Sequence, residues 1–114
     1  MEWATVCSAG EVTELLGIGA LIFDHQVAVF KVDGELYAID NFDPFSQANV
    51  LSRGIVGDLK GELVVASPIY KQHFSLKAGT CLEDGTVSIA VHPVRVQDGM
   101  VQVALGSPVS QQAA

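Results

Sequence analysis

The sequence predicts a single all-β domain, an antiparallel sandwich or barrel with at most one or two short helices. Two Asp-Gly turns between strand-like segments and a series of short apolar runs separated by glycine and proline carry this prediction. The chain has 114 residues, of which 49% are hydrophobic, which is enough for one core. We expect residues 1–105 to form the domain and residues 106–114, which are small and polar, to be a disordered tail.

One short helix is expected near the start of the chain. Ser8 and Glu11 have the spacing of a capping box, and apolar residues follow at helical spacing from Val12. The helix should end at Gly17, because glycine commonly terminates helices.

The first hairpin is expected over residues 26–32 and 35–40, which flank an Asp-Gly pair at 33–34. An Asp-Gly loop supplies the positive φ angles that a type I′ turn requires. With this turn as the centre, Phe30 should lie opposite Tyr37. The continuous apolar run in the first of the two segments indicates a strand covered on both faces.

The second hairpin is expected over residues 93–97 and 100–105, around the Asp-Gly pair at 98–99. Valines alternate with polar residues in both segments, which places Val94 opposite Val103 on one face. Between the hairpins, two further strands are expected over residues 61–67 and 73–76.

The charge and hydropathy of the chain argue against two classes of partner. The formal charge is −7 with only six Lys and Arg residues, whereas binding to nucleic-acid phosphates requires clustered cations. No apolar run approaches the roughly 20 residues of a membrane span, and the first residues lack the features of a signal peptide. We therefore expect a cytoplasmic protein that binds neither nucleic acid nor membrane.

The residues that commonly carry catalysis or bind metals form no recognisable motif. The sequence contains no GxGxxG, P-loop, GxSxG or HExxH pattern. Of the three histidines, His25, His73 and His92, we interpret the last two as partly exposed strand residues. Cys7 and Cys81 are interpreted as small buried thiols, because neither has CxxC or CxH spacing. A single metal ion at His73 would need further ligands that the sequence does not show.

Charged residues are distributed unevenly in the middle of the chain. Asp40 and Asp43 flank a loop and are interpreted as turn residues that accept hydrogen bonds from nearby backbone amides. Four of the six cations lie between positions 53 and 77, and these are Arg53, Lys60, Lys71 and Lys77. They form either a solvated rim or a docking face.

Residues 41–81 resemble the cluster-binding half of a Rieske iron–sulfur domain from which the ligands have been removed. A Rieske centre is held by two Cys and two His, which occur as CxH in one loop and CxxH in a second loop. The string SPIYKQHFSLKAG is similar to the second loop, with Ser67 at the Cys position and Tyr70 at the His position. Phe74 and Gly79 then match the residues that follow this loop in the family.

The first loop, DPFSQANVLSRG, carries one extra residue relative to the family pattern. Depending on where that residue is inserted, the Cys position is Asp43 or Pro44 and the His position is Phe45 or Ser46. None of these is a thiolate or an imidazole, so we expect no [2Fe–2S] cluster in this chain. We also expect no other cofactor and no metal site in it.

Together with PVRVQDGMVQV, these strings resemble the small subunit of assimilatory NAD(P)H-dependent nitrite reductase over about residues 3–105. The resemblance implies a Rieske-like fold without cluster ligands, and no catalytic residue in this chain. It also implies a large-subunit partner that carries FAD, a nicotinamide site, an iron–sulfur cluster and sirohaem and reduces nitrite to ammonium. Two alternatives are a Rieske-type ferredoxin that carries electrons and a free-standing β-domain that binds a small molecule or a metal.

The resemblance also indicates which residues would bind the partner. In cluster-bearing relatives the two loops form the tip through which electrons leave, so a ligand-free relative is expected to use the same tip as a protein contact. Phe45, Ile69 and Tyr70 would be the apolar anchors of this contact. Arg53 and Lys71 would form its polar rim.

Overall fold

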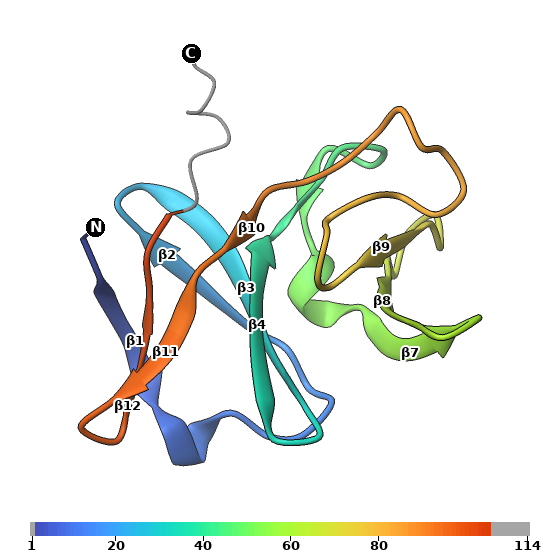
Figure 1. The fold of residues 1–114 in the computed structure, drawn as a ribbon. Helices are drawn as coiled ribbons and strands as arrows, with labels where there is room; N and C mark the ends of the chain where they lie inside the picture. Colours follow the sequence, from blue (N-terminus) through green and yellow to red (C-terminus); the bar gives the residue numbers. More distant parts are fainter. Residues whose placement is uncertain (1, 106–114) are drawn as a thin grey trace.

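The computed structural model describes residues 2–105 and shows an all-β fold of short antiparallel strands (Figure 1). The strands are β1 (Ala4–Ser8), β2 (Ile18–Ile22), β3 (His25–Val32), β4 (Glu35–Asp40), β5 (Phe42–Asp43), β6 (Ala48–Asn49), β7 (Ile55–Leu59), β8 (Glu62–Ala66), β9 (His73–Ser75), β10 (Val91–His92), β11 (Val94–Gln97) and β12 (Met100–Val103). The helical segments in this range are single 3₁₀ turns, η1 (Ala9–Glu11) and η2 (Leu51–Arg53). The predicted fold class is therefore confirmed.

The strands form two groups, which we name the base and the tip. The base contains the sheet β10-β4-β3-β2 and the sheet β1-β12-β11, and the tip contains the sheet β7-β8-β9 and the pair β5-β6. The chain leaves the base after β4, builds the tip, and returns through β10, which pairs with β4. The tip is thus inserted between two neighbouring strands of one base sheet, and the two groups lie side by side in Figure 1.

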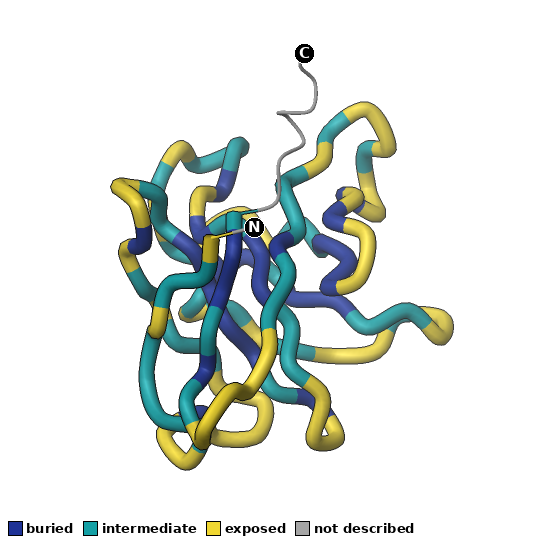
Figure 2. Tube along the Cα trace, turned by 60° about the vertical axis from the view of Figure 1, so that its left-hand side comes forward, coloured by how far each residue is buried: buried dark blue, intermediate teal, exposed yellow. Residues whose placement is uncertain are grey.

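Strand β3 is covered on both faces, as its apolar run predicts. Val27 and Val29 belong to the core between the two base sheets, whereas Ala28 and Phe30 belong to a second cluster that includes buried residues of the tip. Figure 2 shows the buried stretches along the central strands and the exposed residues at the turns. The two cores meet at β3, which ties the base to the tip.

Both hairpins have the predicted register. Phe30 pairs with Tyr37 and Val94 pairs with Val103. The two Asp-Gly turns are left-handed at both positions, for example with φ of 52° at Asp33 and 82° at the following glycine. The strands expected over residues 61–67 and 73–76 are also present, as β8 and β9.

The N-terminal helix prediction is wrong beyond a single turn. Only η1 is helical, and the Ser8 hydroxyl bonds to the Glu11 carboxylate at 3.1 Å instead of capping the turn. The Leu15 backbone has a φ of 70° and its amide donates to the Lys31 carbonyl at 2.9 Å, which binds this segment to β3. Tertiary pairing has overridden the helical pattern, because the chain must become extended to form β2 alongside β3.

Among residues 2–105, no helix is long and apolar enough to cross a membrane. The disordered tail predicted for residues 106–114 lies outside the described residues and stays a prediction. The domain boundary at residue 105 stays a prediction for the same reason.

Candidate functional site

The two loops that correspond to the ligand loops of a Rieske domain have the same length and the same backbone geometry. Loop 1 comprises residues 43–47, from the last residue of β5 to the residue before β6, and loop 2 comprises residues 67–71, between β8 and β9. In each loop the amide of the fifth residue donates to the carbonyl of the first, at 2.7 Å in loop 1 and 3.1 Å in loop 2. That fifth residue has a positive φ in both, 59° at Gln47 and 69° at Lys71. Each loop is therefore a closed turn, with proline as its second residue.

The first side chain of each loop organises its own turn and also joins the two loops. Asp43 accepts a hydrogen bond from the Phe45 amide at 2.9 Å, and Ser67 accepts one from the Ile69 amide at 3.3 Å. The Ser67 hydroxyl in turn donates to Asp43 Oδ2 at 2.6 Å, and the Ser46 hydroxyl donates to the same oxygen at 2.9 Å. Asp43 and Ser67 are both fully buried. Their hydrogen bond cross-links the loops, and we name this group the tip cluster (Asp43, Ser46 and Ser67).

The Asp43 carboxylate is held in its charged form by these donors. Burial alone would raise the pKa of Asp43, but the hydrogen bonds from the Ser67 hydroxyl, the Phe45 amide and Ser46 outweigh burial and keep the pKa below its usual range. The prediction that Asp43 is a turn residue bonded to a nearby amide is confirmed. The bond to Ser67, 24 residues away, goes beyond that prediction.

The tip does not fit a [2Fe–2S] cluster. Such a cluster requires two thiolates and two imidazoles, whereas the positions that face each other across the loops supply a carboxylate at Asp43 and a hydroxyl at Ser67. These two groups are bonded to one another, and the alternative Cys position, Pro44, has no ligand atom in its side chain. Phe45 likewise offers no donor, and the side chain of Tyr70 is exposed. The loops therefore lack the thiolate and imidazole ligands that a Rieske cluster requires.

Most of the predicted partner-binding residues lie exposed on the tip. Ile69 is 45% exposed and Tyr70 is 59% exposed. Lys71 and Arg53 are also exposed, although the Lys71 ammonium lies 3.4 Å from the carbonyl of Pro68 within its own loop. These side chains are accessible to a partner.

Phe45 differs from the other predicted anchors because it is half-buried. Its ring packs against Phe74 with 6.1 Å between centroids, at the edge of the core shared with β3. Two exposed apolar residues that the sequence reasoning missed lie next to the loops: Phe42 precedes Asp43, and Ile55 pairs with the residue before Ser67. The sequence carried no signal for Phe42, because its neighbours Asn41 and Asp43 are polar residues that the structure buries.

The histidines and cysteines depart from their predicted environments in two places. His92 is buried, so its interpretation as a partly exposed residue is wrong, whereas His73 is half-buried and lies 2.5 Å from the Glu83 carboxylate. Cys81 is a buried thiol as predicted, but Cys7 is only half-buried.

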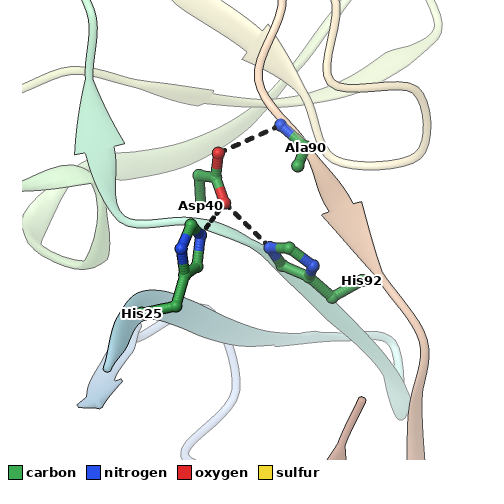
Figure 3. A network of polar contacts seen from close by, with 4 residues as sticks. All are labelled: His25, Asp40, Ala90 and His92. Atoms are coloured by element: carbon green, nitrogen blue, oxygen red, sulfur yellow. Dashed lines mark hydrogen bonds and ion pairs between the residues drawn. The ribbon is translucent and has the colours of Figure 1, made fainter. Parts of the chain in front are cut away.

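A second polar cluster, which the sequence reasoning missed, lies on the base (Figure 3). Both His25 Nε2 and His92 Nε2 lie within hydrogen-bond distance of Asp40 Oδ1, at 2.6 Å and 2.8 Å, and Oδ2 accepts from the Ala90 amide at 3.3 Å. Partial burial alone would raise the pKa of Asp40, but the hydrogen bonds from His92 and His25 outweigh it and hold the pKa below its usual range. We name these three side chains the base cluster (His25, Asp40 and His92).

The interpretation of Asp40 as a turn residue bonded to nearby backbone amides is therefore wrong, because its main partners are histidine side chains distant in the sequence. Asp40 is the last residue of β4, and its histidine partners lie 15 and 52 residues away. The hairpin register contained part of the signal, because it places Val27 opposite Asp40 and His25 two residues further along on the same face.

Known proteins resemble this chain over nearly the whole described range. Residues 2–104 match the family model of the Rieske-like [2Fe-2S] domain. The nitrite reductase (NADH) small subunit of Escherichia coli (strain K12) is 41% identical over 104 residues, which cover 90% of this chain and 96% of that subunit. A solved structure from Mycobacterium tuberculosis, assigned as an NADH-dependent nitrite reductase small subunit, has a TM-score of 0.88 and 47% identity, and the match covers 93% of this chain and 96% of that one.

A further relative contains the same domain within a much longer chain. The nitrite reductase [NAD(P)H] large subunit of Klebsiella oxytoca is 41% identical over 101 residues. These residues are 89% of the present chain and 11% of that protein.

Proposed function

We propose that this chain, which belongs to the family of Rieske-like [2Fe-2S] domains, is the small subunit of an NADH-dependent nitrite reductase. The observation that carries this function is the match along nearly the full length of a nitrite reductase small subunit, at 41% identity over 96% of that protein. A loop cross-link in place of cluster ligands agrees with it, because a Rieske-type ferredoxin would need thiolate and imidazole donors at these positions.

The role of the chain is to bind a catalytic large subunit. We infer that this partner carries FAD, an iron–sulfur cluster and sirohaem and reduces nitrite to ammonium in the cytoplasm. The Klebsiella oxytoca relative supports the association, since a segment equivalent to this chain lies within a protein named as the large subunit. In that protein, the segment equivalent to this chain and the rest of the large subunit belong to one polypeptide.

The contact surface we propose is the end of the tip that carries loops 1 and 2. Ile69 and Tyr70 offer exposed apolar surface, of the type that anchors protein interfaces. Arg53 and Lys71 lie exposed beside it and would contribute charged rim contacts in an otherwise acidic protein. The tip cluster holds both loops in one conformation, so little entropy would be lost when a partner binds them.

Reconstitution with the large subunit tests this function. The two purified chains should form a complex on size-exclusion chromatography, and nitrite-dependent NADH oxidation should be higher with the small chain than without it, or more stable over time. A large subunit that neither binds this chain nor changes its activity or stability in its presence would overturn the proposal.

A further inference from the structure

We propose that His25, Asp40 and His92 bind one divalent transition-metal ion of the class that includes Zn²⁺. Their three ligand atoms, one from each side chain, lie within 4.8 Å of one another (Figure 3). This site lies on the base, outside the loops that correspond to the Rieske cluster position, and it does not rest on the proposed function. It also departs from the expectation, drawn from the sequence, that the chain has no metal site.

The sheet register brings the three side chains to one face. Strand β4 lies between β3 and β10, with Asp40 paired to Val27 and His92 paired to Ala38. Side chains alternate along a strand, so His25 shares the face of Val27, and Asp40 shares the face of Ala38. Each histidine is therefore a diagonal cross-strand neighbour of Asp40, a position within reach of a long side chain.

The carboxylate is oriented toward the rings. Its Oδ2 is held by the Ala90 amide at 3.3 Å, which leaves Oδ1 facing His25 Nε2 and His92 Nε2. Carboxylates that bind metals are themselves hydrogen-bonded, because such a contact fixes the orientation of the ligand. The His25 and His92 rings meet edge to face, with 5.5 Å between their centroids.

Binding requires the carboxylate oxygen and the two histidine nitrogens to move apart slightly, while the three ligand atoms already lie within 4.8 Å of one another. Bonds of about 2.0–2.1 Å to a tetrahedral Zn²⁺ separate neighbouring ligand atoms by roughly 3.3 Å, compared with 2.6 Å and 2.8 Å between Oδ1 and the two nitrogens here. The His92 side chain is 2% exposed and is fixed by its surroundings, whereas His25, the first residue of β3, is 44% exposed. His25 can therefore move outward, and water can complete the coordination on its side.

The donor set selects the class of ion. Two imidazoles and one carboxylate suit Zn²⁺ and its first-row neighbours, whereas Ca²⁺ and Mg²⁺ prefer six or more oxygen ligands. An ion at this position would link three strands at the point where the chain leaves the base, after Asp40, and returns to it, at β10. Because β10 has only two residues, the ion would strengthen a junction that few backbone hydrogen bonds hold.

The test uses the full chain without an affinity tag, stripped of metal with a chelator and then titrated with Zn²⁺. We expect one Zn²⁺ per chain by equilibrium dialysis with metal analysis, and a rise in the thermal midpoint as Zn²⁺ is added. His25→Ala and Asp40→Asn should each weaken Zn²⁺ affinity by at least about 10-fold and abolish the thermal shift. His25→Ala should fold without metal, because that side chain is 44% exposed and belongs to neither hydrophobic core.

The matched control is His73→Ala. His73 is also paired with a carboxylate, that of Glu83 at 2.5 Å, but it belongs to no group of three donors in the described part of the chain. The His73→Ala substitution should leave Zn²⁺ affinity unchanged. The proposal is overturned if the wild type binds Zn²⁺ no better than His25→Ala does, or if His73→Ala weakens binding as much as the base-cluster variants.

Discussion

The tip and the base each contain one cluster of converging polar side chains, and the two clusters differ in their donor atoms. The tip cluster lies where a Rieske domain holds its iron–sulfur centre, yet it consists of one carboxylate that accepts hydrogen bonds from two hydroxyls. The base cluster has two imidazoles and a carboxylate, which are metal-binding groups, at a position outside the two ligand loops.

The backbone geometry of the two loops does not depend on the cluster ligands. Both loops keep closed turns of equal length, with the same i to i+4 backbone bond, although their ligands are gone. A cluster joins two loops through covalent bonds to iron, and here the Asp43–Ser67 hydrogen bond joins them instead. The tip loops are therefore joined by a hydrogen bond, whereas two imidazoles and a carboxylate lie together where three strands of the base meet.

The largest effect should come from breaking the tip cross-link with Asp43→Ala. The substitution leaves the buried Ser67 hydroxyl, the Ser46 hydroxyl and the Phe45 amide without their acceptor, so we expect the free energy of unfolding to fall by about 3 kcal/mol. Urea denaturation with an unchanged m-value measures it. The control is Asp84→Ala, which removes a similar but solvent-exposed turn carboxylate bonded to Thr86 and should cost much less. Equal losses in the two variants would show that Asp43 serves only as a local turn residue.

The next effect concerns binding rather than folding. Tyr70→Ala should weaken the complex with the large subunit by on the order of 1–3 kcal/mol while leaving the unfolding free energy almost unchanged, because the ring is 59% exposed. Phe23→Ala removes an exposed ring from the base and should change neither quantity by much. Isothermal titration of the purified subunits measures the affinity. If Phe23→Ala weakens the complex more than Tyr70→Ala, the contact surface lies on the base.

Phe45→Ala sharpens that result because its ring has two environments. Its packing against Phe74 predicts a loss of stability in addition to any loss of binding. A purely structural role would lower stability and leave affinity unchanged once the folded fraction is taken into account.

The extent to which this molecule could be read from its sequence depends on the range of each interaction. The register of each hairpin was predicted to the residue, although the strand ends were not, because an Asp-Gly turn fixes the register of the strands beside it. The short pairs β5-β6 and β4-β10 leave no such local signal, so the contact between Asp40 and His92 could not be anticipated. The prediction of an N-terminal helix was wrong for a related reason. A helical pattern over a few residues stabilises a helix less than strand pairing with β3 stabilises the extended chain.

The site was predicted in the same uneven way. The resemblance to a Rieske domain identified both loops and the loss of their ligands from short sequence strings. It could not show that Asp43 and Ser67 bond to each other, because that contact depends on how two separate turns face across the tip.

Acid should reveal part of the tip cross-link. The pKa of Asp43 is lower in the folded protein than in the unfolded chain, so its ionised form stabilises the fold above about pH 4, and that contribution is lost as the pH falls from there through the folded pKa. Asp43→Asn keeps the size of the side chain but does not titrate. We expect the difference in unfolding free energy between wild type and Asp43→Asn to shrink as the pH is lowered from about 4. Comparison of the two proteins cancels the contributions of other carboxylates with lowered pKa values, those of Asp40, Glu83 and Asp84.

The smallest effect should come from the cations beside the loops, and it distinguishes a docking face from a solvated rim. Arg53→Glu and Lys71→Glu should slow association with the large subunit and leave dissociation nearly unchanged, because exposed rim charges act mainly on encounter. The slowing should diminish as salt is raised from low ionic strength to 0.15 M and above, where the Debye length is about 8 Å or less. Lys60→Glu is the matched control, since Lys60 lies at the turn of the β7-β8 hairpin, at the end opposite the loops. A salt-dependent slowing of the same size in all three variants would mean that the cations act through net charge alone, and the tip would then carry no directed electrostatic contact.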